Sequence, residues 1–340
     1  MLLVILCAMV AAVASAGLTV LVIELARRAR MLDGPGARRM HEQPTVRGAG
    51  LGFVLTILTA WLALGLTLSW KSELGRWAIA TAGATALVAL VSWIDDRRGL
   101  PVWPRLGAHL LAAALVVFGS WPEGIAAQWW WAALLVFALT ALTNFWNFLD
   151  GINGIAAGIG AVIALVLTGV LVAQENVPAA VFAAVAAGSL LAFMPFNFPK
   201  ARAFMGDVGS ATLGLLVGAL ALMPFDGRNS PLFEVLALAS AVFLDAGLTL
   251  AWRVFRRPRR RWYNAHREHL YQWLARSGWG HTRTTLAYLV WTAGPALGVV
   301  ILGQTRPDLM PIATLVLYLV GAMVWRFGRD YALRRARSRA

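Results

Sequence analysis

The feature that most constrains this chain is a succession of apolar segments of about twenty residues, separated by short polar stretches. A segment of that length can cross a bilayer as a helix. Only 14% of the residues are charged, against about a quarter in ordinary soluble chains. The pattern predicts an all-α, polytopic integral membrane protein with about 10–11 transmembrane helices, near residues 2–25, 50–70, 77–94, 106–120, 129–146, 154–173, 179–197, 211–223, 232–252, 286–303 and 308–325.

The distribution of Lys and Arg predicts the topology. With eleven spans, all but four of the 30 Lys and Arg fall on one side, in the segments 26–49, 95–105, 147–153, 198–210, 253–285 and 326–340. Because cytoplasmic loops carry the excess of basic residues, we expect these segments in the cytoplasm, with the N-terminus outside and the C-terminus inside. The same bias explains the net charge of +14. We therefore expect contacts with membrane lipids and no nucleic-acid partner.

A polar stripe lies at the end of the fifth span. Asn144 and Asn147 are one helical turn apart, and Asp150 continues the same face. Buried amides are costly in a bilayer unless they are bonded, so the structural alternative is a set of hydrogen bonds between helices. Gly151 and Gly154 permit close packing or the approach of backbone to a ligand. Three polar residues in register, followed by these glycines, favour a ligand site.

Two further acidic motifs follow the ends of other spans. Asp95 and Asp96 end the third span, and Asp207 lies between glycines in the segment 204–210. Carboxylates at a bilayer edge need a partner or a cation, and pairing with the two arginines that follow Asp96 is the structural alternative. For Asp207 the alternative is a capping role at the next helix, where Ser210 is the expected N-cap. The N-terminus of that helix would also suit a phosphate group.

Two basic loops are expected to reach the same side. One contains Arg47 among glycines, and the other contains an arginine run followed by His266-Arg267-Glu268-His269. Contact with anionic lipid is the alternative for both. The histidine segment is polar, compact and placed to cover a site. Its two histidines do not predict zinc, because no Cys or further His clusters with them.

Two acidic residues of the ninth span complete the survey. Asp245 is either a hydrogen-bonding residue of the bundle or a residue that lines the site from below, and the sequence leaves both open. Glu234 lies near the outer interface, where we expect it to be solvated.

These groups predict a chemistry. Carboxylate and amide oxygens without clustered His or Cys suit Mg²⁺, which is held through a few protein oxygens and substrate phosphates. Basic side chains beside them suit a diphosphate. The residues therefore predict an Mg²⁺-dependent phosphotransferase at the cytoplasmic interface, with one substrate in water and one in the membrane. A transporter with intramembrane carboxylates is the alternative from another class.

The same motifs resemble those of a known family. They are Asp95-Asp96 with Arg105, the run from Asn144 to Gly154, the segment 204–210, the loop from His41 to Gly48, and His266 to Gln272. Together they are similar to the polyprenyl-phosphate N-acetylhexosamine-1-phosphate transferases, the glycosyltransferase family 4 of WecA and MraY, and closest to its WecA/WbpL-like branch. The resemblance covers nearly the whole chain, which we expect to form one transmembrane catalytic domain over residues 1–340.

The resemblance implies transfer of a sugar-1-phosphate from a UDP-N-acetyl sugar to undecaprenyl phosphate, with release of UMP. This step would start O-antigen or other cell-envelope glycan synthesis at the cytoplasmic membrane of a bacterium. Mg²⁺ would be the cofactor, with Mn²⁺ as a substitute, and a homodimer is left open. By motif, Asp207 and Asn147 would bind the metal, Asp95 or Asp96 would activate or position the lipid phosphate, and Asp150 would support catalysis. The substrate-binding residues would be Arg47, Arg105, Asn144, Asn153, Asn197, Lys200, His266, Arg267 and His269.

One position departs from the family pattern. Many bacterial members carry a second aspartate where this chain has Asn153, which removes a negative charge and leaves hydrogen bonding in place. The histidine segment also differs from the His-rich form of MraY, which argues against a muramyl-pentapeptide donor. An MraY-type phospho-N-acetylmuramoyl-pentapeptide transferase remains the nearest alternative, and the donor sugar is not determined by the sequence.

Overall fold

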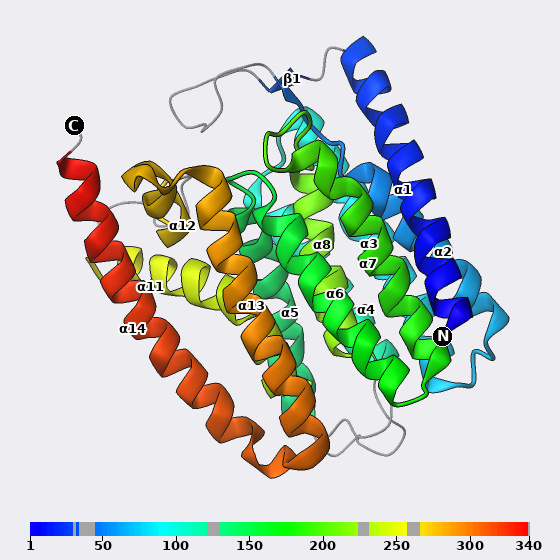
Figure 1. Ribbon diagram of the computed structural model, residues 1–340. Helices are drawn as coiled ribbons and strands as arrows, with labels where there is room; N and C mark the ends of the chain where they lie inside the picture. Colours follow the sequence, from blue (N-terminus) through cyan, green and yellow to red (C-terminus); the bar gives the residue numbers. More distant parts are fainter. Residues whose placement is uncertain (30–31, 34–44, 121–128, 224–230, 257–265, 339–340) are drawn as a thin grey trace.

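The computed structural model describes residues 1–29, 32–33, 45–120, 129–223, 231–256 and 266–338. Figure 1 shows an α-helical bundle whose long helices run alternately up and down along the chain. Its first half contains α1 (Leu2–Arg28), α2 (Leu51–Thr67), α3 (Glu73–Arg98), α4 (Val102–Gly119), α5 (Trp129–Leu149), α6 (Ile155–Ala173) and α7 (Val177–Asn197). The second half contains α8 (Gly206–Ala221), α9 (Pro231–Leu238), α10 (Ser240–Val242), α11 (Leu248–Arg256), α12 (Leu270–Leu274), α13 (Gly280–Thr305) and α14 (Met310–Arg337).

The prediction of an all-α, polytopic membrane protein is confirmed. In the described residues, eight helical segments are long and apolar enough to cross a membrane, and a bent pair of helices makes a ninth. The remaining two predicted spans correspond to the shorter apolar helices α2 and α8. At about 1.5 Å per residue, α8 rises only about 24 Å, against a hydrocarbon core of about 30 Å. Its first turn begins at Gly206 and not at residue 211, so the Asp207 motif belongs to the helix.

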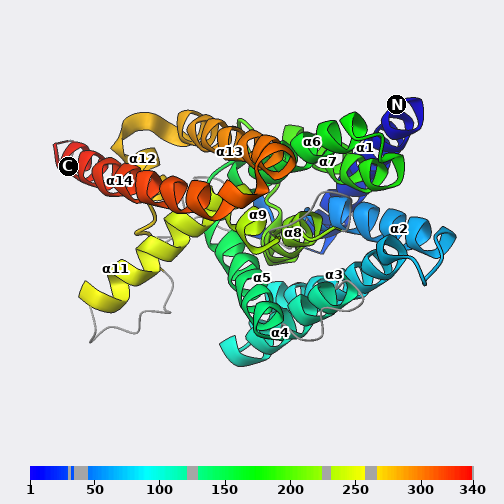
Figure 2. The same cartoon turned by 90° about the horizontal axis from the view of Figure 1, so that it is seen from below.

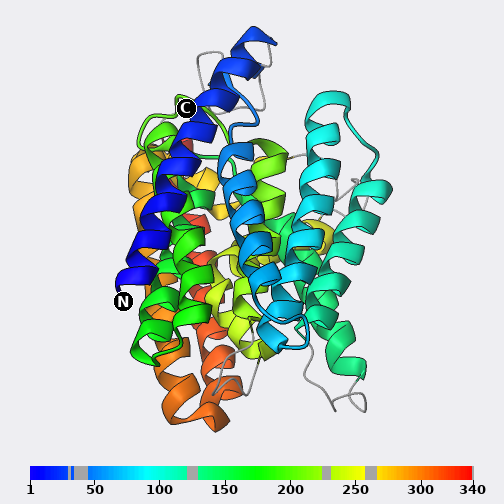
Figure 3. The same ribbon diagram turned by 90° about the vertical axis from the view of Figure 1, so that its right-hand side faces the viewer.

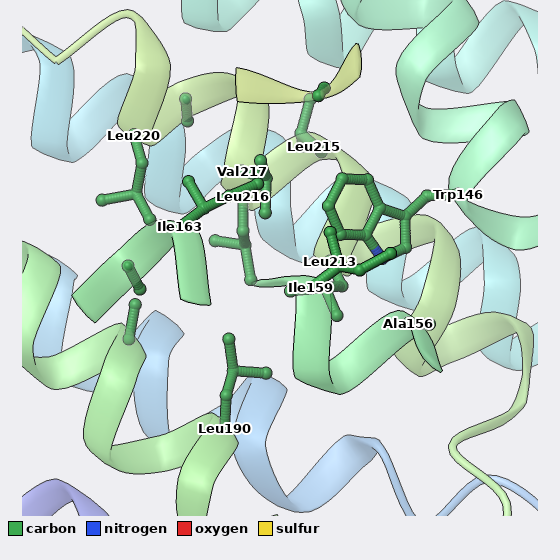
Figure 4. Packing of buried hydrophobic residues seen from close by; sticks show 14 of the residues in the cluster. Trp146, Ala156, Ile159, Ile163, Leu190, Leu213, Leu215, Leu216, Val217 and Leu220 are labelled. Carbon is green, nitrogen blue, oxygen red and sulfur yellow. The ribbon is translucent and has the colours of Figure 1, made fainter. Parts of the chain in front are cut away.

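Helix α8 forms the centre of the bundle. Figure 2 shows it surrounded by other helices, and it packs against α2, α3, α5, α6 and α9. Every residue of α8 is buried except Asp207. Gly214 allows the close approach of α5, because a Cβ atom there would lie 2.8 Å from the Trp146 side chain. Around this contact, side chains of α5, α6, α7 and α8 fill the core shown in Figure 4.

The polar motifs meet at one end of this bundle. Figures 1 and 3 place the α3–α4, α5–α6 and α7–α8 connections at the end where α1 finishes and the C-terminus lies, and the N-terminus toward the other end. A two-stranded antiparallel sheet of β1 (Leu32–Asp33) and β2 (Thr45–Val46) lies at the same end. The predicted loops 95–105, 147–153 and 198–210 therefore share a side. Their assignment to the cytoplasm stays a prediction.

The ninth predicted span is bent by 69° between α9 and the helix that starts at Ser240. A single wide turn, the π-helix η2 (Phe243–Gly247), precedes α11, which projects away from the bundle in Figures 1 and 2. The expectation that Glu234 on α9 is solvated is wrong. Its side chain packs inside the bundle, and the residue is 6% exposed.

Candidate active site

Two loops that are distant in the chain pair along their backbones to form the floor of the site. Phe204 N donates to Val46 O at 2.8 Å, and Ala49 N donates to Phe204 O at 3.0 Å. The isolated bridge between Val46 and Ala203 extends this pairing. Because Arg47 lies inside the paired segment, its side chain is delivered to the start of α8. Residues 34–44, which include His41 and Pro44 of the same predicted motif, lie outside the described residues.

Asp207, Asp96 and Arg47 form one charged cluster. Nη2 of Arg47 lies 2.8 Å from Oδ1 of Asp207 and 2.9 Å from Oδ1 of Asp96. Asp96 also accepts hydrogen bonds from the backbone N–H groups of Asp207, at 3.1 Å, and Val208, at 3.0 Å. The carboxylate that caps α8 thus comes from α3. Satisfying these first-turn N–H groups is a usual role of an N-cap side chain.

The predicted N-cap role of Ser210 is therefore wrong. Its hydroxyl lies inside the first turns of α8 and donates to Gly206 O at 3.1 Å. Gly206 has a φ of +72°, and a Cβ atom there would lie 2.8 Å from Oδ2 of Asp96. Only glycine fits this conformation and this close approach without strain. The close contact between α3 and α8 therefore requires a glycine immediately before Asp207.

Asp95 is held by a second arginine. Nη1 of Arg105, on α4, lies 2.5 Å from Oδ2 of Asp95 and 4.0 Å from Oδ2 of Asp207. Leu100 N donates to Oδ1 of Asp95 at 2.5 Å and closes the turn between α3 and α4. Arg47 and Arg105 thus bracket Asp207 from two sides, and each is anchored by one of the adjacent carboxylates. The predicted convergence of the Asp95, Asp96 and Asp207 motifs is present in the structure.

The asparagine stripe of α5 faces this cluster. Nδ2 of Asn147 donates to the Ser210 hydroxyl at 3.0 Å, which places the amide beside the first turn of α8. One turn earlier, Asn144 donates to Thr140 O at 2.7 Å, and its side chain lies beside that of His109, a buried residue of α4. Asn144 is therefore engaged between α4 and α5. His109 was not among the predicted site residues, although it follows Arg105 by one helical turn.

Asp150 lies just after the last residue of α5, in the turn that leads to α6. Burial raises the pKa of its carboxyl to about 7, and the neighbouring Asp207 carboxylate adds to the shift. Arg47 acts in the opposite direction and only partly offsets these effects. At neutral pH this carboxyl is divided between its neutral and ionised forms.

Replacement of Asp150 by Asn should reveal this shift as a pH-dependent stability. A folded-state pKa raised from 3.8 to about 7 stabilises the fold below pH 3.8, and this stabilisation is lost as the pH rises to 7. We expect the thermal midpoint of wild type, measured in detergent with EDTA, to fall relative to Asp150→Asn between pH 5 and 8. The expected difference is a few degrees, because part of the side chain is exposed and solvent screens the charge. Parallel midpoints across this range would contradict the assigned pKa.

The turn after Asp150 is tied to the α7–α8 connection by two asparagines. Asn197 is 2% exposed, accepts from Gly154 N at 2.8 Å and donates to Ala203 O at 2.9 Å. Nδ2 of Asn153 donates to Pro199 O at 3.0 Å. An aspartate at position 153 could not donate this bond, so the departure from the family pattern has a local structural reason. Both ends of the Asn197 amide are engaged in holding the loops together. Lys200, the next predicted substrate-binding residue, is exposed beside them.

The histidine segment lies beside the end of α5. The rings of His266 and His269 stack with their centroids 4.8 Å apart, and the His269 ring lies 6.2 Å from that of Phe148. The Tyr271 hydroxyl donates to Phe148 O at 2.9 Å. Burial lowers the pKa of His266 to about 3, so its imidazole is neutral at physiological pH. The segment therefore reaches the neighbourhood of Asp150, as the motif predicts.

Two further residues beside the site, His281 and Thr285, were not predicted from the sequence. The hydroxyl of Thr285 donates to Asn153 O at 2.8 Å, and Asn153 N donates to Nδ1 of His281 at 3.4 Å. Both come from the first turns of α13. No local motif marks these two residues as part of a site. The sequence shows only that an apolar helix begins with polar residues.

The oxygen atoms at the start of α8 fit Mg²⁺ chemistry. No group of three or more His, Cys, Asp or Glu within the described parts of the chain is arranged to hold a metal. Mg²⁺ does not require one, because it is commonly held by one or two protein carboxylates together with substrate phosphates and water. Asp207 offers the carboxylate. Asn147 donates its amide nitrogen to Ser210, so its carbonyl oxygen is the atom that would suit a metal ion.

The fold and the site together define a multi-pass helical bundle in which arginines and carboxylates gather at one end. Residues 78–224 match the family described as glycosyl transferase family 4. The chain is 32% identical over 317 residues to the decaprenyl-phosphate N-acetylglucosaminephosphotransferase of Mycobacterium leprae, covering 82% of this chain and 79% of that protein. The protein of the same name from Mycolicibacterium smegmatis is 33% identical, over 78% of this chain and 73% of its own length.

A second group of relatives is more distant. The phospho-N-acetylmuramoyl-pentapeptide-transferase of Heliobacterium modesticaldum is 28% identical over 286 residues, covering 77% of this chain and 83% of that protein. The chain belongs to the polyprenyl-phosphate N-acetylhexosamine-1-phosphate transferases of glycosyl transferase family 4. It is a multi-pass membrane enzyme of the phosphosugar transferase class, and the transporter alternative is left without support.

Proposed function

We propose that this enzyme transfers an N-acetylhexosamine-1-phosphate from a UDP-sugar to a polyprenyl phosphate, with release of UMP. The observation that carries the proposal is the position of Asp207, which lies between Arg47 and Arg105 and beside Asn147 at the start of the central helix. We propose that the site lies on the cytoplasmic face of a bacterial cytoplasmic membrane, where the soluble donor and the lipid acceptor would meet. We assign the reaction to the first step of a cell-envelope glycan, of the O-antigen kind or another.

The reaction needs positioning and charge neutralisation more than covalent chemistry. An oxygen of the acceptor phosphate attacks the β-phosphorus of the donor, the bond between the β-phosphorus and the bridging oxygen breaks, and UMP leaves with the electron pair. When bound by Asp207 and Asn147, Mg²⁺ would neutralise charge on the donor diphosphate. Arg47 and Arg105 supply positive charge on either side of Asp207. Asp95 and Asp96 hold these arginines in place.

The histidine segment is the proposed contact of the donor diphosphate. Nε and Nη2 of Arg267 are buried, and neither has a hydrogen-bond partner among the described residues. Buried N–H donors are rarely left without an acceptor in a finished structure, and a guanidinium edge fits phosphate oxygens. The neutral His266 beside it can donate one hydrogen bond without adding charge.

The identities of donor and acceptor are open to a direct test. Purified enzyme with Mg²⁺ should release UMP from at least one UDP-N-acetylhexosamine, and EDTA should abolish the release. Mg²⁺ or Mn²⁺ should restore it, because both cations accept oxygen ligands. Undecaprenyl and decaprenyl phosphate should be compared as acceptors, since the mycobacterial relatives are named for decaprenyl phosphate.

The same panel tests the second candidate function. UDP-N-acetylmuramoyl-pentapeptide belongs in it because of the likeness to the Heliobacterium protein. UMP release from this donor alone would replace the proposed donor class with that of the pentapeptide transferases. No UMP from any donor, with an enzyme that is folded and binds polyprenyl phosphate, would contradict the proposed function.

A further inference from the structure

Asp245 lies in the wide turn that follows the bend after α9, and the residue is 2% exposed. A carboxylate at such a position is costly unless it is paired or hydrogen-bonded. The charged cluster around Asp207 uses other acids. Its contacts therefore decide between the two roles that the sequence leaves open.

Both oxygens of Asp245 face the histidine segment and α12. Oδ1 accepts from Leu270 N at 2.7 Å and lies 3.6 Å from Nδ1 of His269. Oδ2 accepts from Tyr271 N at 3.1 Å and from the Tyr288 hydroxyl at 2.6 Å. The Thr249 hydroxyl completes the set with a longer contact of 3.4 Å to Oδ1. The carboxylate thus caps the first N–H groups of α12 from another helix.

Two arginines hold the same segment at other points. Nη1 of Arg253, on α11, lies 3.1 Å from Oε1 of Glu268. Arg276, in the turn after α12, donates to Arg267 O through its Nη2. The backbone from residue 267 to residue 271 is therefore tied to the bent helix and to the turn that precedes α13. Within the part of the chain that the structure describes, Nε and Nη2 of Arg267 are buried and have no hydrogen-bond partner.

The wide turn explains how the carboxylate reaches this segment. π-turns inside helices redirect side chains and are frequent at functional sites. Here the turn follows the 69° bend and places Asp245 under the N–H groups of Leu270 and Tyr271. Tyr271 in turn donates to Phe148 O, two residues before Asp150. The chain of contacts from Asp245 to the end of α5 is continuous.

We infer that Asp245 is a positioning residue that presents His266, Arg267 and His269 to the diphosphate of the nucleotide-sugar donor. The inference rests on the proposed function. In it, the bent helix holds the histidine segment in place. Asp245 touches neither substrate. Its loss should therefore weaken donor recognition and leave acceptor recognition in place.

The test compares Asp245→Asn with wild type in the full-length enzyme. An amide can accept on one side only, so it cannot serve both Leu270 N and Tyr271 N. We expect the KM for the UDP-sugar to rise at least about tenfold, the range seen when partners that orient a ligand-binding group are removed. The KM for polyprenyl phosphate should stay near that of wild type, because the contacts of Asp245 among the described residues all go to the histidine segment, α12, α13 and its own helix. Ser240→Ala, a buried change in the same bent helix, is the matched control and should leave both KM values near those of wild type.

A second readout does not depend on activity. Hydrogen exchange at the amides of Leu270 and Tyr271 should be faster in Asp245→Asn than in Ser240→Ala, because these N–H groups lose their acceptor. If the proposed function fails, wild type releases no UMP, yet this exchange difference still tests the contact. A loss of kcat with an unchanged donor KM, or equal rises of both KM values, would overturn the inference. If Asp245→Asn does not fold, Tyr288→Phe takes its place, and a donor KM that does not rise selectively in that variant overturns the inference.

Discussion

Asp207→Asn is expected to reduce UMP release by at least about a hundredfold, the scale on which removal of one electrostatic group from a reaction centre acts. Asp207 is the carboxylate that both arginines bracket, and it is the one partly exposed residue of the otherwise buried α8. The change keeps the shape of the side chain and removes its charge. The fold should survive, since the cap of α8 is supplied by Asp96 through backbone N–H groups.

Asp308→Asn is the matched control for that variant. Asp308 pairs with Arg306 at 2.9 Å between α13 and α14, at the end of the bundle away from the site, and both side chains are 60% exposed. An exposed pair of this kind contributes little to stability. UMP release should remain near that of wild type. If Asp207→Asn keeps more than about a tenth of the wild-type rate, a loss of only about 1.4 kcal/mol, then Asp207 is not at the reaction centre.

Asp96→Ala should lower both activity and stability. The substitution removes the acceptor of Asp207 N and Val208 N and one of the two carboxylates bound by Arg47. Each buried N–H group left without an acceptor costs about 1–3 kcal/mol. We expect the thermal midpoint in detergent to fall by several degrees, as such a loss implies, and UMP release to fall with it, because Asp207 and Arg47 lose their fixed positions.

Asp95→Ala distinguishes the role of Asp95 from that of its neighbour Asp96. Asp95 holds Arg105 and closes a turn through Leu100 N, so its loss should affect activity more than the thermal midpoint. If Asp96→Ala keeps the wild-type midpoint while activity is lost, Asp96 acts directly on a substrate and the capping role assigned to it is wrong. Assays at saturating donor and acceptor distinguish a lost group from weaker binding.

The sequence predicts which end of the bundle carries the site. Spans of alternating direction return every second connection to the same side, so Asp95, Asp150 and Asp207 had to share a side once the spans were recognised. Their residue types also limited the metal to one that prefers oxygen. The role of each residue within the cluster could not be predicted from the sequence. The cap of α8 comes from Asp96, 111 residues away from Asp207, and no local pattern predicts such a partner.

The same limit applies to the loops around the cluster. The sequence did not predict that the amide of Asn197 joins Gly154 to Ala203, because a buried amide is satisfied by whichever backbone groups surround it. Its position near the nucleotide stays a prediction. The bend at α9–α11 was missed since an apolar run predicts a span but not its straightness. The role of Asp245 could not be predicted for the same two reasons. It depends on the bend and on contacts with a segment about 25 residues further along the chain.

We propose that Asp207 and Asn147 form a divalent-cation site at the start of α8, on which the proposed mechanism depends. Electron paramagnetic resonance of Mn²⁺ measures it most directly, by titration of the purified enzyme in the presence of its UDP-sugar. We predict a saturable loss of the free-ion signal at one Mn²⁺ per chain in wild type, with a strongly weakened site in Asp207→Asn. Equal Mn²⁺ binding by wild type and Asp207→Asn would contradict the account.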